Sequence, residues 1–134
     1  MDLKSYTNFI NESKKVSYSA IVLDEKSHKD LLSRYDIPSG WKEFARHMTI
    51  NLGELKDKSL IGKKVTMKVV GIGKDDKVIA VKIDSPVKRT IGGTEHITIA
   101  VNTKGGGKPV MSNNIKQFKP SKAFTITGTV KELT

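Results

Sequence analysis

The sequence predicts one small domain of the α/β or α+β class, because segments with strand and helix patterns alternate along the chain. Its 134 residues are about the length of a single domain, and a hydrophobic content of 37% is enough to close one modest core. No internal repeat and no low-complexity linker divides the chain. We therefore expect a single domain over residues 16–134, preceded by an N-terminal amphipathic segment over residues 1–15.

Six segments are expected to be strands, because they are rich in β-branched and aromatic residues and contain few breakers. In chain order they are residues 16–23, 47–52, 65–70, 78–83, 97–101 and 124–130. The third and fourth are expected to form a hairpin around the turn Gly73-Lys-Asp-Asp76.

Three helical segments are expected among these strands. The first, over residues 2–12, is predicted from the helical spacing of Leu3, Tyr6, Phe9 and Ile10. Ser27 is expected to cap a second helix, which carries Leu31, Leu32 and Tyr35 and ends before Pro38. His28, near the start of that helix, is expected to be a solvated surface residue. A short helical segment is also expected near residues 113–118.

The charge indicates the class of partner. Lys and Arg number 24 against 14 Asp and Glu, which gives a formal net charge of +10 and favours a polyanionic partner such as nucleic acid, a nucleotide or a phosphorylated ligand. From Lys104 onward, six lysines stand against Glu132 alone. The alternative is that the lysines only keep a small protein in solution.

The composition excludes several classes of protein and site. The chain has no cysteine, which excludes disulfides, thiol nucleophiles and thiolate metal sites. It has no apolar run of about 18 residues, and its first residues lack the apolar stretch of a secretory signal. We therefore expect no membrane span and a cytoplasmic location.

The sequence contains two short motifs of the same form, His-x-Thr. They stand in the segments Arg46-His47-Met48-Thr49-Ile50 and Glu95-His96-Ile97-Thr98-Ile99. In a strand, the histidine and the threonine of each motif share one face about 7 Å apart, and the apolar residues lie on the other face. We expect both strands to lie centrally in antiparallel sheets, with their histidines facing one groove and their apolar faces in the core.

Two imidazoles at one groove suit phosphodiester chemistry. His47 and His96 are the candidate catalytic pair: one removes a proton from the attacking water or hydroxyl, and the other protonates the leaving oxygen. Thr49 and Thr98 can donate hydrogen bonds to the non-bridging phosphate oxygens. No metal or other cofactor is expected, because no spaced carboxylate cluster accompanies the histidines. The alternative is that the motifs are ordinary surface strands in which each histidine pairs with its threonine.

The two motifs resemble those of the 2H phosphoesterase superfamily, which includes RNA-ligating and cyclic phosphodiesterase enzymes. The segment Ser19-Ala-Ile-Val-Leu-Asp24, the helix after it, and Gly40-Trp41 leading to His47 are similar to the opening strand–helix–strand of that family. The resemblance covers residues 16–131. It implies an α+β, bilobal fold in which antiparallel sheets form a concave groove with helices on the outer side. It also implies catalytic roles for the two histidines and phosphate-binding roles for the two threonines.

The sequence departs from the family pattern at two points. The residue before each histidine is charged, Arg46 and Glu95, where an apolar residue is usual, and the motifs are only 49 residues apart (47 to 96). These departures bear on the substrate more than on the chemistry. The resemblance implies as substrate an RNA end with a cyclic phosphate, or a cyclic nucleotide or oligonucleotide. The opening segment also resembles the starts of small phage proteins, which implies a host cytoplasm as the location.

Three further residues are candidate substrate contacts. The loop Gly105-Gly-Gly-Lys108 follows the second motif, and its amides could face an anion while Lys104 and Lys108 add charge. The alternative is a flexible loop. Trp41 could stack on a base, although a single Trp is also a common core residue. The rival function is a non-catalytic, basic, β-rich nucleic-acid-binding module, in which changing either histidine has no effect on binding.

Overall fold

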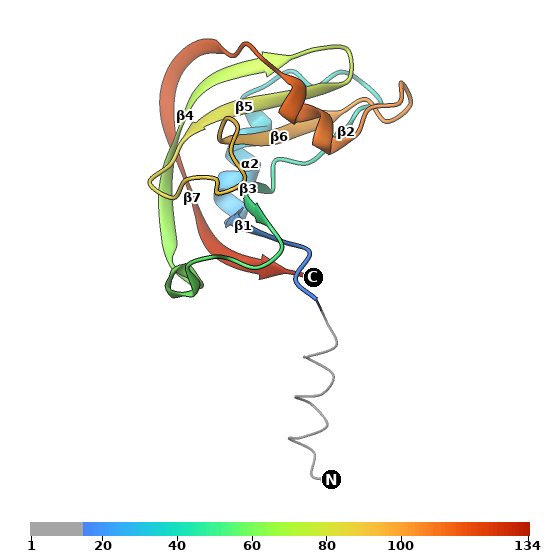
Figure 1. The fold of residues 1–134 in the computed structure, drawn as a ribbon. Helices are drawn as coiled ribbons and strands as arrows, with labels where there is room; N and C mark the ends of the chain where they lie inside the picture. The colour runs from blue at the N-terminus through green and yellow to red at the C-terminus, as the bar shows by residue number, and fades with distance from the viewer. Residues whose placement is uncertain (1–14) are drawn as a thin grey trace.

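The structure of residues 15–134, a computed structural model, consists of one antiparallel sheet with few helical segments (Figure 1). Within these residues seven strands pair in the order β2-β6-β5-β4-β7-β1-β3. The elements in chain order are β1 (Tyr18–Leu23), α2 (Glu25–Ser33), β2 (Lys42–Glu43), β3 (His47–Leu52), η1 (Lys58–Leu60), β4 (Lys64–Lys74), β5 (Val78–Asp84), β6 (His96–Val101), η2 (Pro109–Asn114) and β7 (Lys119–Leu133). The α+β class expected from the sequence is confirmed at this coarse level.

Two long strands give the sheet its curl. β4 and β7, which are 11 and 15 residues long, pair with each other and bend through the molecule, with β5 and β6 at one end and β1 and β3 at the other (Figure 1). The register of β4 against both neighbours shifts between Val69 and Gly71. Such a bulge adds local twist and bends the strand that carries it.

The chain from β2 to β3 joins the two ends of the sheet. β2 pairs with β6, and the amides of Phe44 and Ala45 continue that pairing to the carbonyls of Ile99 and Thr98, both at 2.8 Å. From Arg46 onward the same chain is bonded to β1 instead. Ala45, at the change of partner, has a positive φ of 56°.

The expectation that the two His-x-Thr strands lie centrally in the sheet is therefore wrong. β3 is an edge strand, and β6 is separated from the opposite edge only by the two residues of β2. The curl of the sheet and the β2–β3 chain bring these two ends together.

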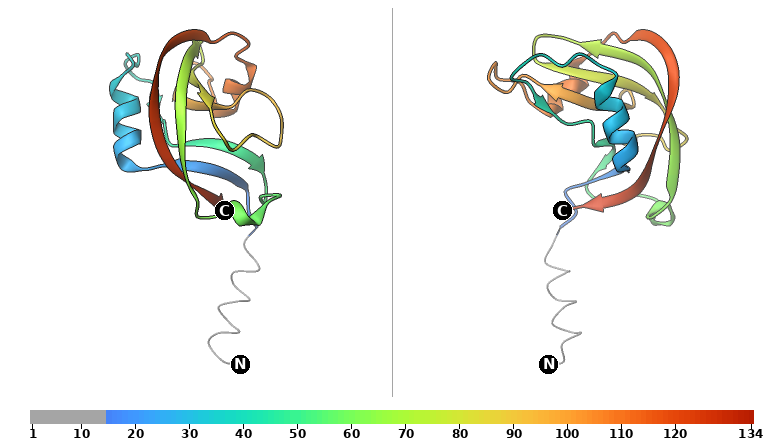
Figure 2. Two further views of the ribbon diagram at one scale, coloured as in Figure 1. Left: turned by 90° about the vertical axis from the view of Figure 1, so that its left-hand side faces the viewer. Right: turned by 180° about the vertical axis from the view of Figure 1, so that it is seen from behind.

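The apolar core lies on one face of the curled sheet. The inward residues of the two motif strands, Met48, Ile50, Ile97 and Ile99, are at most 1% exposed, as their alternation predicts. Leu31 of α2 is also fully buried in this core. α2 lies on one side of β4 and β7, and η2 and the loop of residues 85–95 lie on the other (Figure 2, left).

Most elements expected from the sequence are confirmed, with different ends. The second helix begins earlier than expected, because Asp24 and not Ser27 is its N-cap: the carboxylate of Asp24 accepts a hydrogen bond from the Ser27 amide at 2.7 Å. The short helical segment lies at Pro109–Asn114, where Pro109 occupies the first turn, and not at 113–118. The last strand begins at Lys119. The helix expected over residues 2–12 lies outside the described residues.

Within residues 15–134, no helix combines the length and the apolar character that crossing a membrane requires.

Candidate active site

The two motif histidines, His47 and His96, stand two residues beyond the last bond between the β2–β3 chain and β6. Partners in that pairing run in antiparallel order, with Lys42 opposite Val101 and Glu43 opposite Ala100. The hydrogen bond from the Ala45 amide to the Thr98 carbonyl keeps this order, and from Arg46 onward the chain leaves β6 for β1. The charge of His96 contributes to lowering the pKa of His47, after the larger effect of burial.

The ring of His96 is held through its Nδ1 atom. Nδ1 lies 2.7 Å from the carbonyl oxygen of Thr94 and 3.0 Å from Nη1 of Arg89. A carbonyl only accepts and a guanidinium only donates, so these two contacts belong to opposite protonation states of Nδ1. Burial lowers the pKa of His96, the Thr94 carbonyl opposes this shift, and the charge of Arg89 adds to it.

The ring of His47 lies against an aromatic neighbour. The ring centroids of His47 and Tyr18, the first residue of β1, are 5.1 Å apart with the planes tilted by 36°. Both influences on the pKa of His47, burial and His96, lower it, so this imidazole favours its neutral form. A neutral imidazole has a free nitrogen lone pair and can accept a proton.

The two motif threonines have different surroundings. The hydroxyl of Thr98 lies 2.8 Å from the hydroxyl of Ser112 in η2, and Ser112 is only 1% exposed. Because either oxygen can donate, Ser112 can supply the proton for this bond and leave the Thr98 hydroxyl free to donate elsewhere. Thr49 is half-buried on the His47 face of β3.

Beside His96 the surface is hollowed into a cavity of about 360 Å³. The loop of residues 89–94 forms one wall, and η2 with the chain after it forms the other. Its lining includes His96, Arg89, Ser112, Asn113 and Phe118. Its volume lies near the lower end of the range of about 300–1,000 Å³ that is usual for small-molecule sites.

Arg89 places an unsatisfied donor beside His96. Its Nη1 contacts Oδ1 of Asn113 at 3.3 Å in addition to His96, whereas its Nε is buried and has no hydrogen-bond partner among the described residues. Burial lowers the pKa of this guanidinium, and the charge of Glu95 acts in the opposite direction. Because Arg89 also lines the cavity, its positive charge favours an anionic ligand there.

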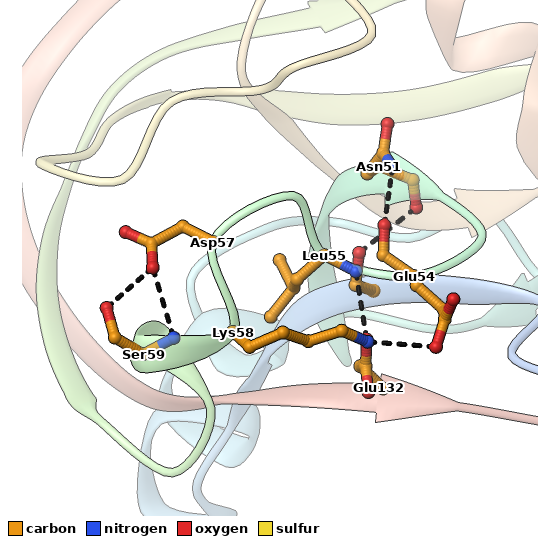
Figure 3. Close-up of polar contacts among 8 residues, drawn as sticks. Asn51, Glu54, Leu55, Asp57, Lys58, Ser59 and Glu132 are labelled. Atoms are coloured by element: carbon orange, nitrogen blue, oxygen red, sulfur yellow. Dashed lines mark hydrogen bonds and ion pairs between the residues drawn. The ribbon is translucent and has the colours of Figure 1, made fainter.

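The third polar residue on the His47 face, Asn51, is committed to the fold. Its side-chain amide donates to the carbonyl of Glu54 at 2.7 Å, where the chain turns after β3 (Figure 3). Glu132 of β7 then accepts from the Leu55 amide at 2.9 Å and pairs with Lys58, which also reaches Glu54. These contacts fasten the end of β3 to β7.

Of the site residues predicted from the sequence, His96 alone lines this cavity; the others, His47, Thr49, Thr98, Trp41, Lys104 and Lys108, do not. Trp41 is half-buried and packs against the core. Lys104 and Lys108 are exposed, in a loop tied to the β4–β5 turn through Lys77. The three glycine amides of that loop bond to the carbonyls of Asn102 and Thr103, so they are already satisfied within the loop.

His28 is not a solvated surface residue, and that expectation is wrong. It is 8% exposed, and its Nδ1 lies 2.9 Å from the carbonyl oxygen of Ala45. The reason is its position in α2: His28 precedes Leu31 by three residues and Leu32 by four, so it shares their inward face.

Sequence reasoning missed Arg89, Ser112 and the Thr94 carbonyl. They lie outside the motifs, and their positions depend on how the 85–95 loop and η2 pack on the sheet. The one signal for Arg89 is that it is one of only three arginines in a lysine-rich chain, seven residues before His96. For Ser112 the sequence contains no signal.

Residues 15–134 contain no cluster of three or more His, Cys, Asp or Glu side chains arranged to hold a metal ion. Comparison of the chain with family models, with curated proteins and with solved structures gives no match.

Proposed function

We propose that the protein is a metal-independent phosphodiesterase of the 2H type, which cleaves a cyclic phosphate or an RNA-like phosphodiester by two-histidine acid–base catalysis. The observation that carries this proposal is the bond between Ala45, two residues before His47, and Thr98, two residues after His96, next to a cavity lined by His96 and Arg89. The bilobal groove of that family, with helices on its outer side, belongs to the same proposal.

Within the proposal, His47 is the general base and His96 the general acid. Burial and His96 both favour the neutral form of His47. For His96, by contrast, the Thr94 carbonyl and the charge of Glu95 both act to raise the pKa and so favour the protonated form. With Nδ1 bonded to Thr94, the Nε2–H of a protonated His96 is available to the leaving oxygen.

The threonine and arginine side chains stabilise charge in this mechanism. The hydroxyls of Thr49 and Thr98 donate to the non-bridging oxygens, on which negative charge develops in the transition state, and the guanidinium of Arg89 stabilises the same charge. Arg89→Lys keeps the charge but removes the planar fork, and we expect a loss of about 10²-fold in turnover.

The first candidate substrate is an RNA end with a 2′,3′-cyclic phosphate, as in RNA repair. The second is a cyclic nucleotide or oligonucleotide signal, degraded in the cytoplasm of the cell or of a phage host. The test incubates the protein with both kinds of substrate in the presence of EDTA and separates the products by chromatography. We expect turnover that persists with EDTA and falls about 10²–10⁴-fold in His47→Ala and in His96→Ala.

A basic nucleic-acid-binding module is the rival function, and the net charge of +10 favours it. The same variants separate the two. In the rival case no substrate is turned over, and both histidine variants bind RNA as the native protein does. Turnover that disappears with EDTA and returns with a divalent ion would contradict the proposed mechanism.

A further inference from the structure

A second, larger cavity of about 900 Å³ adjoins the candidate active site. The two cavities share Thr94 and Phe118 in their linings. The larger one lies between the ends of β4 and β5, the chain after α2, and residues 116–120. It is therefore an extension of the site that contains His96.

Four lysines line the larger cavity, against one carboxylate. They are Lys74, Lys82, Lys116 and Lys119, and the carboxylate is Asp36. Within residues 15–134 none of the four forms an ion pair, whereas Lys58 and Lys88 on other surfaces do. Unpaired cations around one hollow repel each other, and an anionic ligand relieves that repulsion.

One of these lysines connects the cavity to the candidate catalytic pair. Lys82 of β5 is the cross-strand partner of His96. Directly opposed residues point to the same face of a sheet, with Cβ atoms about 4.5–5.5 Å apart. The lysine cluster therefore begins next to the imidazole that we propose as the general acid.

Residues 115–118, which separate the two cavities, pack closely against Gly73 of β4. A Cβ atom at Gly73 of β4 would lie 2.6 Å from Cγ2 of Ile115 and 3.0 Å from Cδ1 of Phe118. The absence of a side chain at Gly73 thus lets residues 115–118 cross close to the strand. This crossing places the half-buried Phe118 ring between the two cavities, where a base can stack on it.

We propose that the larger cavity binds the phosphate and the base of a second nucleotide, so that the substrate is an oligonucleotide with at least one phosphodiester beyond the bond that is cleaved. This proposal rests on the function proposed above. The lysines bind the additional phosphate, and Phe118 stacks on the adjacent base. A mononucleotide fills the smaller cavity alone.

Binding of inert probes tests the subsite without requiring turnover. We compare uridine 3′-phosphate with the dinucleotide that carries one further nucleotide on its 5′ side, using isothermal titration calorimetry. The native protein should bind the dinucleotide at least tenfold more tightly. In the double variant Lys116→Met/Lys119→Met this ratio should fall to near one. The double variant Lys56→Met/Lys131→Met removes the same charge from exposed positions outside both cavities and should keep the ratio.

Equal affinity of the native protein for the two probes would overturn the subsite, as would a ratio that Lys116→Met/Lys119→Met leaves unchanged. The outcomes also separate the two proposals. Turnover of cyclic phosphates with equal probe affinities means that the subsite is wrong and the function stands. Tight, lysine-dependent binding of the dinucleotide without any turnover means that the subsite stands and the catalytic function is wrong.

Discussion

The Nδ1–H of His28 in α2 donates a hydrogen bond of 2.9 Å to the carbonyl oxygen of Ala45, two residues before His47. The amide of Ala45 donates to Thr98 of the second motif at 2.8 Å. Both backbone polar groups of this fully buried residue are thus used to hold the chain where it passes from β6 to β1. Its positive φ of 56° costs an alanine about 1 kcal/mol, so these bonds maintain a conformation that alanine does not prefer.

Replacing His28 should therefore affect both stability and turnover. In His28→Ala the Ala45 carbonyl loses a buried partner, and we expect the free energy of unfolding in urea to fall by about 1–3 kcal/mol. Turnover at a temperature where the variant stays folded should also fall, with little change in KM, because His47 is displaced. His28→Asn has an amide donor at the position of Nδ1 and should recover part of both losses. Unchanged stability and turnover in His28→Ala would show that the bond positions nothing.

The sequence predicted the strands better than their arrangement. Alternation located the strands beginning at His47 and His96, because a half-buried strand has one apolar face whatever its neighbours are. The first residues of β7, Lys119 to Ala123, contain no such alternation, and they are strand because they pair with β4 at Gly71 and Ile72. The edge position of β3 likewise follows from the curl of the whole sheet, which no local pattern encodes.

The candidate site likewise has some residues that the sequence predicts and others that it does not. The two histidines and two threonines were found because both members of each pair stand on one strand. Arg89 reaches the site from a loop and Ser112 from η2, and both positions depend on tertiary packing, for example on the bond between the Thr90 amide and the Ile50 carbonyl. The burial of His28 could have been predicted from the sequence, since its helical spacing from Leu31 and Leu32 places it on their buried face.

The dependence of kcat/KM on pH should be bell-shaped, with its maximum on the acid side of the ordinary histidine pKa of about 6.5. Burial lowers the pKa of both His47 and His96, and the proposed mechanism requires one neutral and one protonated imidazole. Both limbs of the bell therefore move to lower pH. The measurement is kcat/KM between pH 4 and pH 9 at constant ionic strength. A maximum above pH 7.5 would contradict the prediction that two histidines with lowered pKa values control the reaction.

The same lowered pKa values make stability depend on pH. A histidine that resists protonation in the folded protein binds its proton more readily in the unfolded chain. The free energy of unfolding should thus decrease as the pH falls through about 6.5, until the folded histidines are themselves protonated. Urea denaturation across this range should show the decrease, and the variant His47→Gln/His96→Gln should show less of it.

The assignment of base and acid can be tested with a substrate that needs no acid. In a p-nitrophenyl phosphodiester of uridine the leaving group is stable as an anion, so protonating it adds little. His96→Ala should lose much less turnover on this substrate than on an RNA-like phosphodiester, whereas His47→Ala should be equally impaired on both. The opposite pattern would exchange the two roles, and equal losses for both variants would contradict any division into acid and base.

The final prediction concerns the hydroxyls of Thr98 and Ser112, which lie 2.8 Å apart. Thr98→Val keeps the shape of the side chain but removes the proposed donor to the phosphate and also leaves the buried Ser112 without its partner. Thr49→Val removes a donor alone. We expect each to cost about 1–3 kcal/mol in transition-state stabilisation, measured as kcat/KM, but only Thr98→Val should also lower the free energy of unfolding.

Ser112→Ala should lower turnover less than Thr98→Val, because the Thr98 hydroxyl can still donate to the phosphate without it. If Ser112→Ala abolished turnover while Thr98→Val left it intact, Ser112 would be the residue that contacts the phosphate, and the second motif would be a structural strand.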